Sequence, residues 1–308
     1  MNLKMPKFWL IKKVSFLSIL FYPISLIFYL TRFISKLKIA KKYPIKIICV
    51  GNIFIGGTGK TPLSAEIFKI TKSLGKKPAF VKKYYDYIRD EINFLSAVGK
   101  TFSLKSRHES IKRSIEDKHD LLILDDGLQD HSIKKDFSIV CFNQKQWVGN
   151  GFLIPSGPLR DKLSVISQAD CIFINGNKDE KIEKEVYKYD IDAKIYYSEY
   201  IPININSFKN KKIIAFAGIG NPNSFFDILE DHKLDVLEKI SFPDHYYYKS
   251  SDINSLMTKS KESESILLTT EKDYLRLKQE YKNNINFLKI KLDIKNLNSF
   301  LDLIKKKI

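Results

Sequence analysis

The sequence predicts an α/β fold in which a parallel sheet carries helices on both faces. Short apolar runs that are typical of buried strands recur through the chain, at 45–50, 121–124, 137–142 and 171–174. Segments of helical period or polar loops separate these runs, and that alternation is characteristic of parallel α/β sheets. The first run leads directly into the glycine-rich stretch GNIFIGGTGKTP at 51–62, which is followed by apolar residues at helical spacing. A strand, a glycine-rich turn and a helix in this order open the fold.

Composition fits a globular protein of one large or two modest domains. The chain has 308 residues, of which 44% are hydrophobic and 28% charged, and its formal net charge is +17. A basic surface suits nucleic acid, an anionic membrane or a phosphorylated substrate. The basic residues are spread along the chain, so general compositional drift is an equal alternative. The cysteines at 49, 141 and 171 show no CxxC spacing, which predicts buried reduced thiols and no zinc site.

The N-terminal segment carries an uncharged apolar run over 14–31, VSFLSILFYPISLIFYLT, with Lys12 and Lys13 before it and basic residues within 32–42 after it. Its 18 residues are at the lower limit for a membrane span, and Pro23 should kink a helix there. Three interpretations remain open: a bitopic anchor, a helix lying in the membrane interface, or a buried first helix of the soluble fold. Basic residues on both sides favour shallow association with a membrane surface from the cytoplasmic side.

The stretch at 51–62 has the composition of a phosphate-binding loop and makes the predicted fold P-loop NTPase-like. Its glycines let backbone N–H groups close around phosphate oxygens, next to the positive end of the following helix. Lys60 would reach the β- and γ-phosphates, and the Thr61 hydroxyl would bind Mg²⁺. The usual pattern has glycine at 54, where this chain has Phe54. The predicted nucleotide contacts are Phe54, Ile55, Gly56, Gly57, Thr58, Gly59, Lys60 and Thr61.

A second element of the site is expected where the apolar run 121–124 ends in Asp125 and Asp126. Parallel strands direct their carboxyl ends to one crevice, so these carboxylates should face the phosphate loop. We predict that Thr61, Asp125 and Asp126 hold Mg²⁺ or its water shell. An ordinary Asp-Asp-Gly turn is the alternative. Arg160, at the end of a stretch rich in glycine and proline, is a candidate phosphate contact or a surface salt bridge.

Motifs become sparse after residue 180, and a boundary or connecting ribbon is expected near 195–210. Asn177-Lys178 resembles the start of a guanine-reading N-K-x-D motif, but the fourth position is Glu180, so guanine specificity is not predicted. A strand, a glycine turn and a helix start again at 212–230. The expected division is an apolar membrane-associating segment at 1–42, a nucleotide-binding domain at 43–200 and a smaller α/β domain at 201–308.

Six motifs in order resemble the tetraacyldisaccharide 4′-kinase family, the lipid A 4′-kinases of Gram-negative bacteria. They are VGNIFIGGTGKTP at 50–62, LDDGLQ at 124–129, GNGFLIPSGPLR at 149–160, AGIGNP at 217–222, FPDH at 242–245 and TEKD at 270–273. The resemblance covers most of the chain from residue 45 onward, and the apolar N-terminal helix is similar to the family's membrane-associating helix. Phosphate loops of this family do not require the first glycine, which accounts for Phe54.

The resemblance implies transfer of the γ-phosphoryl group of ATP, with Mg²⁺, to the 4′-hydroxyl of lipid A disaccharide 1-phosphate, forming lipid IVA at the cytoplasmic face of the inner membrane. The enzyme would be peripheral or monotopic, and the domain at 201–308 would contribute to the acceptor site. Lys60 would act on the phosphates, and an aspartate–histidine pair would serve the acceptor, with the aspartate helping to deprotonate the sugar hydroxyl.

His245 of the FPDH motif matches the histidine of that pair. The aspartate belongs to a G-D-E-P-like motif, which here reads I-R-D-E-I and lacks both the glycine and the proline. Asp90 is therefore the first candidate, and Asp86 is its competitor. The usual S-R-G-Y-G stretch is also replaced, by V-K-K-Y-Y-D at 81–86.

Other classes of phosphate-loop protein fit the sequence less well. A membrane-associated switch or partitioning-type ATPase is the main alternative, but partitioning ATPases carry lysine where this chain has Ile55, and switch GTPases need the N-K-x-D motif. A nucleic-acid ATPase would show helicase motifs or aromatic stacking clusters. We expect no nucleic-acid partner and no obligate protein partner.

Overall fold

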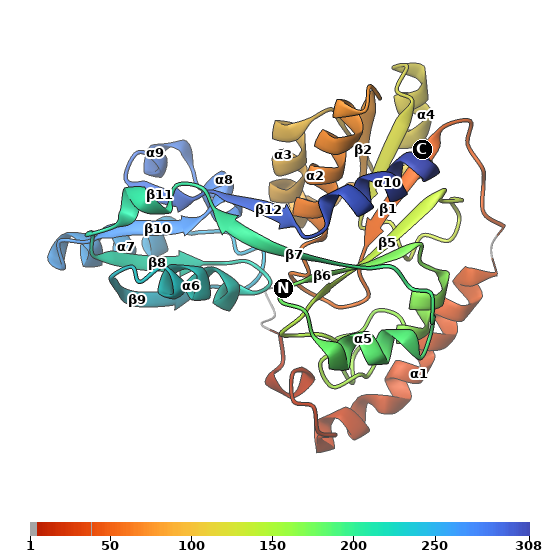
Figure 1. Ribbon diagram of the computed structural model, residues 1–308. Helices are drawn as coiled ribbons and strands as arrows, with labels where there is room; N and C mark the ends of the chain where they lie inside the picture. The colour runs from red at the N-terminus through yellow and green to blue at the C-terminus, as the bar shows by residue number, and fades with distance from the viewer. Residues whose placement is uncertain (1–4, 38) are drawn as a thin grey trace. The chain divides into compact units, whose positions relative to one another are not determined.

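The computed structural model describes residues 5–37 and 39–308 (Figure 1). The chain divides into two compact units, and each is described by itself. The expected division at 1–42, 43–200 and 201–308 differs from these units in three places. Residues 5–37 and 39–42 group with the larger unit, a short segment near residue 90 groups with the smaller unit, and the C-terminus groups with the larger one. The larger unit comprises Met5–Tyr85, Leu95–Glu199 and Leu292–Ile308, and the smaller comprises Asp86–Phe94 and Tyr200–Lys291.

An eight-stranded sheet forms the centre of the larger unit, in the order β12-β7-β6-β5-β1-β4-β2-β3. Its pairs from β3 through to β7 are parallel. β7 and β12 each continue into the smaller unit. The strands are β1 (Lys46–Gly51), β2 (Pro78–Lys83), β3 (Thr101–Leu104), β4 (Leu121–Asp125), β5 (Phe137–Asn143), β6 (Cys171–Asn175), β7 (Ile195–Pro202) and β12 (Ile290–Ile294).

Helices cover both faces of this sheet, because successive strand residues point to opposite sides. On one face Phe68 of α2 stacks on Phe80 of β2, and Phe300 of α10 packs against Phe173 of β6. On the other face Ile111 of α4 joins a buried cluster that also contains residues of α5. The helices are α2 (Lys60–Ser73), α4 (Arg107–Glu116), α5 (Glu180–Tyr187) and α10 (Leu297–Lys307), with α3 (Arg89–Val98) running from the smaller unit into the larger.

The smaller unit is built on a four-stranded parallel sheet of order β11-β10-β8-β9. Its two faces carry separate cores: α6 packs Phe225 and Leu229 on one, and α7 packs Ile253 on the other. The unit is therefore a second α/β layer structure, as the sequence predicts. Its elements are β8 (Ile213–Ala217), α6 (Pro222–Asp231), β9 (Val236–Ser241), α7 (Ser250–Glu262), β10 (Ile266–Thr270), α8 (Glu271–Arg276), α9 (Gln279–Lys282) and β11 (Ile285–Leu288). Short 3-10 helices lie at Lys7–Trp9, Asp86–Ile88, Leu163–Gln168 and Ile205–Phe208.

The apolar N-terminal run forms α1 (Phe16–Lys36), a helix that continues through Pro23. It is long and apolar enough to cross a membrane, yet only 11% of its apolar window is buried. The structure therefore does not support the third interpretation, a buried first helix. Ser18 and Ser25 are its buried residues, whereas Phe16 and Ile27 are among many exposed apolar side chains. Part of the predicted segment 1–42, residues 1–4 and 38, lies outside the described residues.

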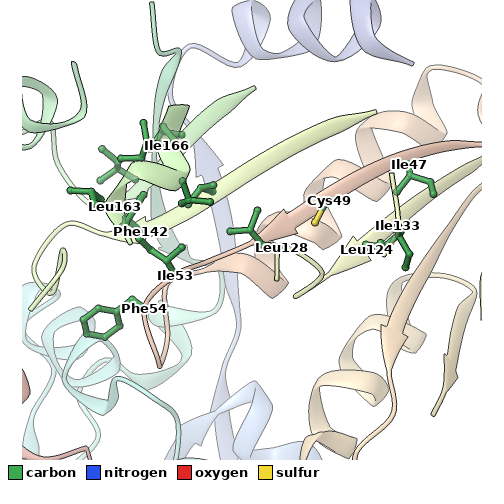
Figure 2. Packing of buried hydrophobic residues seen from close by; sticks show 14 of the residues in the cluster. Ile47, Cys49, Ile53, Phe54, Leu124, Leu128, Ile133, Phe142, Leu163 and Ile166 are labelled. Carbon is green, nitrogen blue, oxygen red and sulfur yellow. The ribbon is translucent and has the colours of Figure 1, made fainter. Parts of the chain in front are cut away.

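The three cysteines are free and buried, in agreement with the sequence prediction. Burial raises the pKa of Cys49 to about 11. These thiols fill the hydrophobic core, and Figure 2 shows Cys49 in the same cluster as Leu124 and Leu128.

Candidate active site

The phosphate loop joins the end of β1 to the first turn of α2, where the sequence predicts it (Figure 1). Gly56 and Gly59 have φ values of 117° and 88°, a region that strongly favours glycine. Gly59 is the N-cap of α2, so Lys60 and Thr61 are its first two helical residues. Backbone N–H groups at the start of a helix have no partner within the helix and bind anions readily. The local geometry is that of an anion cradle.

Phe54 lies inside the hydrophobic core, with its side chain fully buried. Figure 2 shows it among the buried side chains of that cluster. An isolated antiparallel bridge joins Phe54 to Leu159, and the Ile55 amide donates to the Pro158 carbonyl at 2.9 Å. Of the predicted nucleotide contacts, Phe54 can therefore offer only its backbone. The position lacks glycine because its side chain anchors the loop.

Asn52 holds the loop together from its first residue. Its side-chain amide donates to the Thr58 hydroxyl at 2.8 Å and to the Gly56 carbonyl at 3.4 Å. The Asn52 carbonyl in turn accepts from Gln129 at 2.7 Å and from Arg160 at 3.0 Å. Asn52 and Thr58 are both buried, so these bonds fix the loop before any ligand arrives.

Asp125 ends β4 with its side chain fully buried. It accepts hydrogen bonds from the Thr61 hydroxyl at 3.2 Å and from the Ser64 hydroxyl at 2.9 Å. The Lys82 ammonium contacts the carboxylate oxygen that Thr61 also approaches. The structure thus brings Thr61 and Asp125 together, as the sequence predicts, and adds two residues, Ser64 and Lys82, that the sequence interpretation missed.

Asp126 forms a bidentate ion pair with Arg160, at 2.7 and 3.1 Å. Arg107 also donates to the Asp126 carbonyl at 2.6 Å. Burial by itself raises the pKa of the Asp126 carboxyl, but the charges of Arg160 and Lys60 outweigh it and hold the pKa well below its usual range. Asp126 is therefore ionised at neutral pH. Arg160 was expected to contact phosphate or to form a salt bridge, and the structure shows it in an ion pair with Asp126.

The side-chain oxygen atoms of Thr61 and Asp125 are suitable ligands for magnesium. Among residues 5–37 and 39–308, no group of three or more His, Cys, Asp or Glu side chains could hold a metal ion. Mg²⁺ in nucleotide sites is commonly held by one or two protein oxygens together with phosphate and water. The Thr61 hydroxyl and the Asp125 carboxylate are hard oxygen ligands of this kind, 3.2 Å apart.

A second cluster of polar residues lies in the smaller unit, around Asp90 at the start of α3. Asp90 Oδ1 lies 3.0 Å from His245 Nδ1, and Asp90 Oδ2 accepts from Arg276 at 2.7 Å. Asp86, the competing candidate, is exposed and pairs with Arg89 at 3.0 Å. The structure therefore brings Asp90 to His245, although 155 positions separate them in sequence.

The motifs AGIGNP, FPDH and TEKD meet around Gly218. The His245 amide donates to the Gly218 carbonyl at 3.1 Å, and Arg276 donates to the same carbonyl at 2.6 Å. The Gly218 amide donates to the buried carboxylate of Asp273, which also accepts from Tyr248 at 2.8 Å. Arg276 completes the network with a 2.9 Å bond to Asp273. The network fixes the positions of Asp90 and His245.

The charges of this network keep Asp90 ionised. Burial by itself raises the pKa of the Asp90 carboxyl, but its hydrogen bond with His245 and the charge of Arg276 bring that pKa well below its usual range. The Asp90 side chain is 3% exposed, whereas that of His245 is 21% exposed. His245 has a φ of 55°, a backbone conformation that is uncommon for residues other than glycine. The ring is the accessible member of the pair.

Arg276 is the residue of this cluster that the sequence interpretation missed. It follows the TEKD motif by three positions, one turn along α8, so it shares a helix face with Asp273. The spacing of Asp273 and Arg276, an acidic and a basic residue three positions apart at the end of the TEKD motif, was the sequence pattern that could have identified Arg276.

Comparison with known proteins identifies related chains along nearly the whole length. A sequence model described as "Tetraacyldisaccharide-1-P 4'-kinase" matches residues 16–103 and 90–308. A curated relative named "Tetraacyldisaccharide 4'-kinase" from Pelagibacter ubique is 41% identical over 310 residues, covering 98% of each chain. One of the same name from Rickettsia typhi is 36% identical over 313 residues, covering 94% of each.

Among solved structures, LpxK from Aquifex aeolicus, crystallised in complex with ATP, is similar in fold. The match has a TM-score of 0.71 and 24% sequence identity, and it covers 94% of this chain and 99% of that one.

Proposed function

Because the chain belongs to the tetraacyldisaccharide 4′-kinase family, it is a kinase of lipid A biosynthesis, and we propose which of its residues serve the donor and which the acceptor. It transfers the γ-phosphoryl group of ATP to the 4′-hydroxyl of a lipid A disaccharide 1-phosphate. The nucleotide belongs to the phosphate loop of the larger unit, and the acid–base pair to the smaller unit. The bond between Asp90 and His245 carries this assignment.

ATP would be held by the backbone of residues 54–59 and by Lys60. The left-handed Gly59 at the N-cap of α2 and the bonds from Asn52 support this, since they preform the cradle. Thr61 and Asp125 would hold Mg²⁺, and Asp126 would lie in the outer shell. The metal, when bound, neutralises charge on the β- and γ-phosphates. Lys60 adds a second positive charge, which stabilises the charge that spreads over the transferred group.

The acceptor hydroxyl needs a group that takes its proton, because a sugar alcohol is a poor nucleophile. We assign that task to the Asp90–His245 pair. Both Asp90 oxygens are engaged, by His245 and Arg276, and the low pKa of Asp90 makes it a weak base. A neutral His245 that donates from Nδ1 to Asp90 has a lone pair on Nε2. The proton would thus pass to Nε2, while Asp90 orients the ring and stabilises the imidazolium.

Membrane association would come from α1. Its exposed face is apolar along the whole helix, while its polar Ser18 and Ser25 face the protein. Lys36 pairs with Asp161 at 3.0 Å and ties the C-terminal end of the helix to the larger unit. A helix whose apolar side faces outward, fixed to the protein by its polar side, suits peripheral or monotopic binding to the cytoplasmic face of the membrane.

The deciding experiment is a kinase assay with a lipid A disaccharide 1-phosphate acceptor, comparing wild type with Asp90→Asn and Asp86→Asn. We expect Asp90→Asn to lower kcat by at least about 100-fold and Asp86→Asn to leave it within about twofold, because positioned acid–base groups contribute on that scale. Equal losses in both variants would contradict the assignment. ATP hydrolysis without transfer to the glycolipid would instead favour the switch or partitioning ATPase.

A further inference from the structure

Lys82 is a buried lysine in the phosphate site. It lies near the end of β2, its side chain is 3% exposed, and its ammonium contacts Asp125 Oδ2. Lysine is almost never fully buried unless it is paired with an opposite charge. The pairing thus places a fixed positive charge beside the carboxylate that we assign to the metal.

The sheet topology explains how Lys82 reaches this position. β4 lies between β1 and β2, and all three are parallel, so their carboxyl ends meet at one edge. The register pairs Val81 with Leu124, and the next residues along are Lys82 and Asp125. The same carboxylate accepts from Thr61 and Ser64 of α2. Lys82 is therefore held beside Asp125 by the backbone of β2, the strand that pairs with β4.

The charged side chains at this edge of the sheet interact electrostatically. The positive charges of Lys60 and Lys82, together with Arg160, lower the pKa of Asp126. An ammonium at that place attracts the phosphates of a nucleotide and repels a divalent cation. At an effective dielectric constant of about 20, a unit charge a few ångströms away changes an ion's binding by a factor of ten or more.

We propose that Lys82 is a positioning residue that sets how strongly ATP binding depends on Mg²⁺. This rests on the proposed function, because it assumes that the phosphate loop binds ATP. Lys82 holds Asp125 against Thr61 before the metal arrives and supplies positive charge to a nucleotide that enters without metal. Mg²⁺ then adds less affinity than it would in a site without this ammonium. Lys82 thus acts in two ways: it positions Asp125, and its positive charge attracts the phosphates of the nucleotide.

The test is calorimetric titration of the full-length protein with ATP, once in excess Mg²⁺ and once in EDTA. The quantity measured is the ratio of the Kd in EDTA to the Kd in Mg²⁺. We expect Lys82→Met to raise this ratio about tenfold or more over wild type, because a lost positive charge weakens metal-free binding and removes the repulsion of Mg²⁺. A role restricted to folding would leave the ratio unchanged.

Lys83→Met is the matched control. It removes the same charge from the next position of β2, where Lys83 lies over the Tyr85 ring at 5.2 Å, and neighbouring strand residues point to opposite sides. Lys82→Gln keeps an N–H donor for Asp125 and serves as the test variant where Lys82→Met does not fold. A ratio within about twofold of wild type in the folded Lys82 variant, or an equal change in Lys83→Met, overturns the proposal. Wild-type protein that binds no ATP in either buffer would instead overturn the assignment of the nucleotide site.

Discussion

Replacement of His245 by asparagine isolates the chemistry of its ring from the structure around it. His245 has a φ of 55°, and asparagine is one of the few residues that tolerates this conformation. The variant loses the 3.0 Å contact with Asp90, but Asp90 keeps its bond to Arg276 at 2.7 Å. The ring is partly exposed, so little packing is lost. We expect the free energy of unfolding to fall by about 1.5–3 kcal/mol, the usual contribution of a hydrogen bond to a charged group.

The effect on catalysis should be larger. Loss of a positioned general base lowers turnover by about 100- to 10,000-fold, so kcat of His245→Asn should fall in that range. The KM for ATP should stay within about twofold, because other residues, 54–61, are assigned to the nucleotide. The assay is transfer of radiolabelled γ-phosphate to the disaccharide lipid at varied ATP. His232→Asn is the control, since His232 is an exposed histidine of the same unit that bonds the Ile228 carbonyl. A kcat within threefold of wild type would refute the role of His245, and an equal loss of ATP affinity would move it to the nucleotide site.

Three further predictions concern other parts of the chain. Lys60→Ala should weaken ATP binding at least tenfold and abolish turnover, as calorimetry and the same kinase assay would measure; unchanged turnover would contradict the phosphate-loop assignment. The pKa of Asp90 is depressed by folding, so its stabilisation is fully present above the ordinary carboxyl pKa of about 4 and is lost progressively as pH falls from there through the depressed pKa of the folded state. Asp90→Asn should therefore lower the Tm most at pH 7 and by a smaller amount at pH 3; an equal loss at both would show that its charge does not matter. Removal of residues 1–37 should move the protein from the membrane to the soluble fraction on centrifugation, and a protein that still sediments with membranes has another anchor.

The sequence predicted the central strands well because these strands are buried on both faces. β1, β4, β5 and β6 contain continuous apolar runs, and their observed bounds differ from the predicted ones by about one residue. β3 and β9 were missed. Both are edge strands, all of their residues are partly buried or exposed, and their apolar pattern is weak.

The division into units depends on long-range pairing that no local pattern reveals. Residues 292–308 return to the larger unit because β12 lies beside β7, where the Lys295 amide donates to the Tyr197 carbonyl at 2.9 Å. Phe300 then packs on Phe173 of β6. A boundary placed where motifs fade cannot detect such a return.

In the candidate site, too, local sequence patterns predicted contiguous motifs but not contacts between distant segments. The phosphate loop is contiguous, so glycine spacing alone located it. The interaction of Lys82 with Asp125 joins neighbouring strands, and that of Arg276 with Asp90 joins two helices far apart in sequence. Both arginine and lysine are common on surfaces, so their burial could be known only from the fold. Asp90 and His245 were named from a family resemblance, and their contact gives that resemblance a physical basis.

The GNGFLIPSGPLR motif has no residue that we assign to chemistry, yet its contacts explain its composition. Ser25 of α1 donates to the Leu153 carbonyl and bonds the Ser156 hydroxyl, each at 2.9 Å. Further along the same segment, the Pro158 carbonyl accepts from Ile55, and the Arg160 amide donates to the Ile53 carbonyl at 2.6 Å. The segment is thus a continuous brace between the outward-facing apolar helix and the phosphate loop. Under our proposal that α1 lies on the membrane, this brace, fixed at both ends by hydrogen bonds, would hold the nucleotide at a set distance from the surface that carries the lipid acceptor.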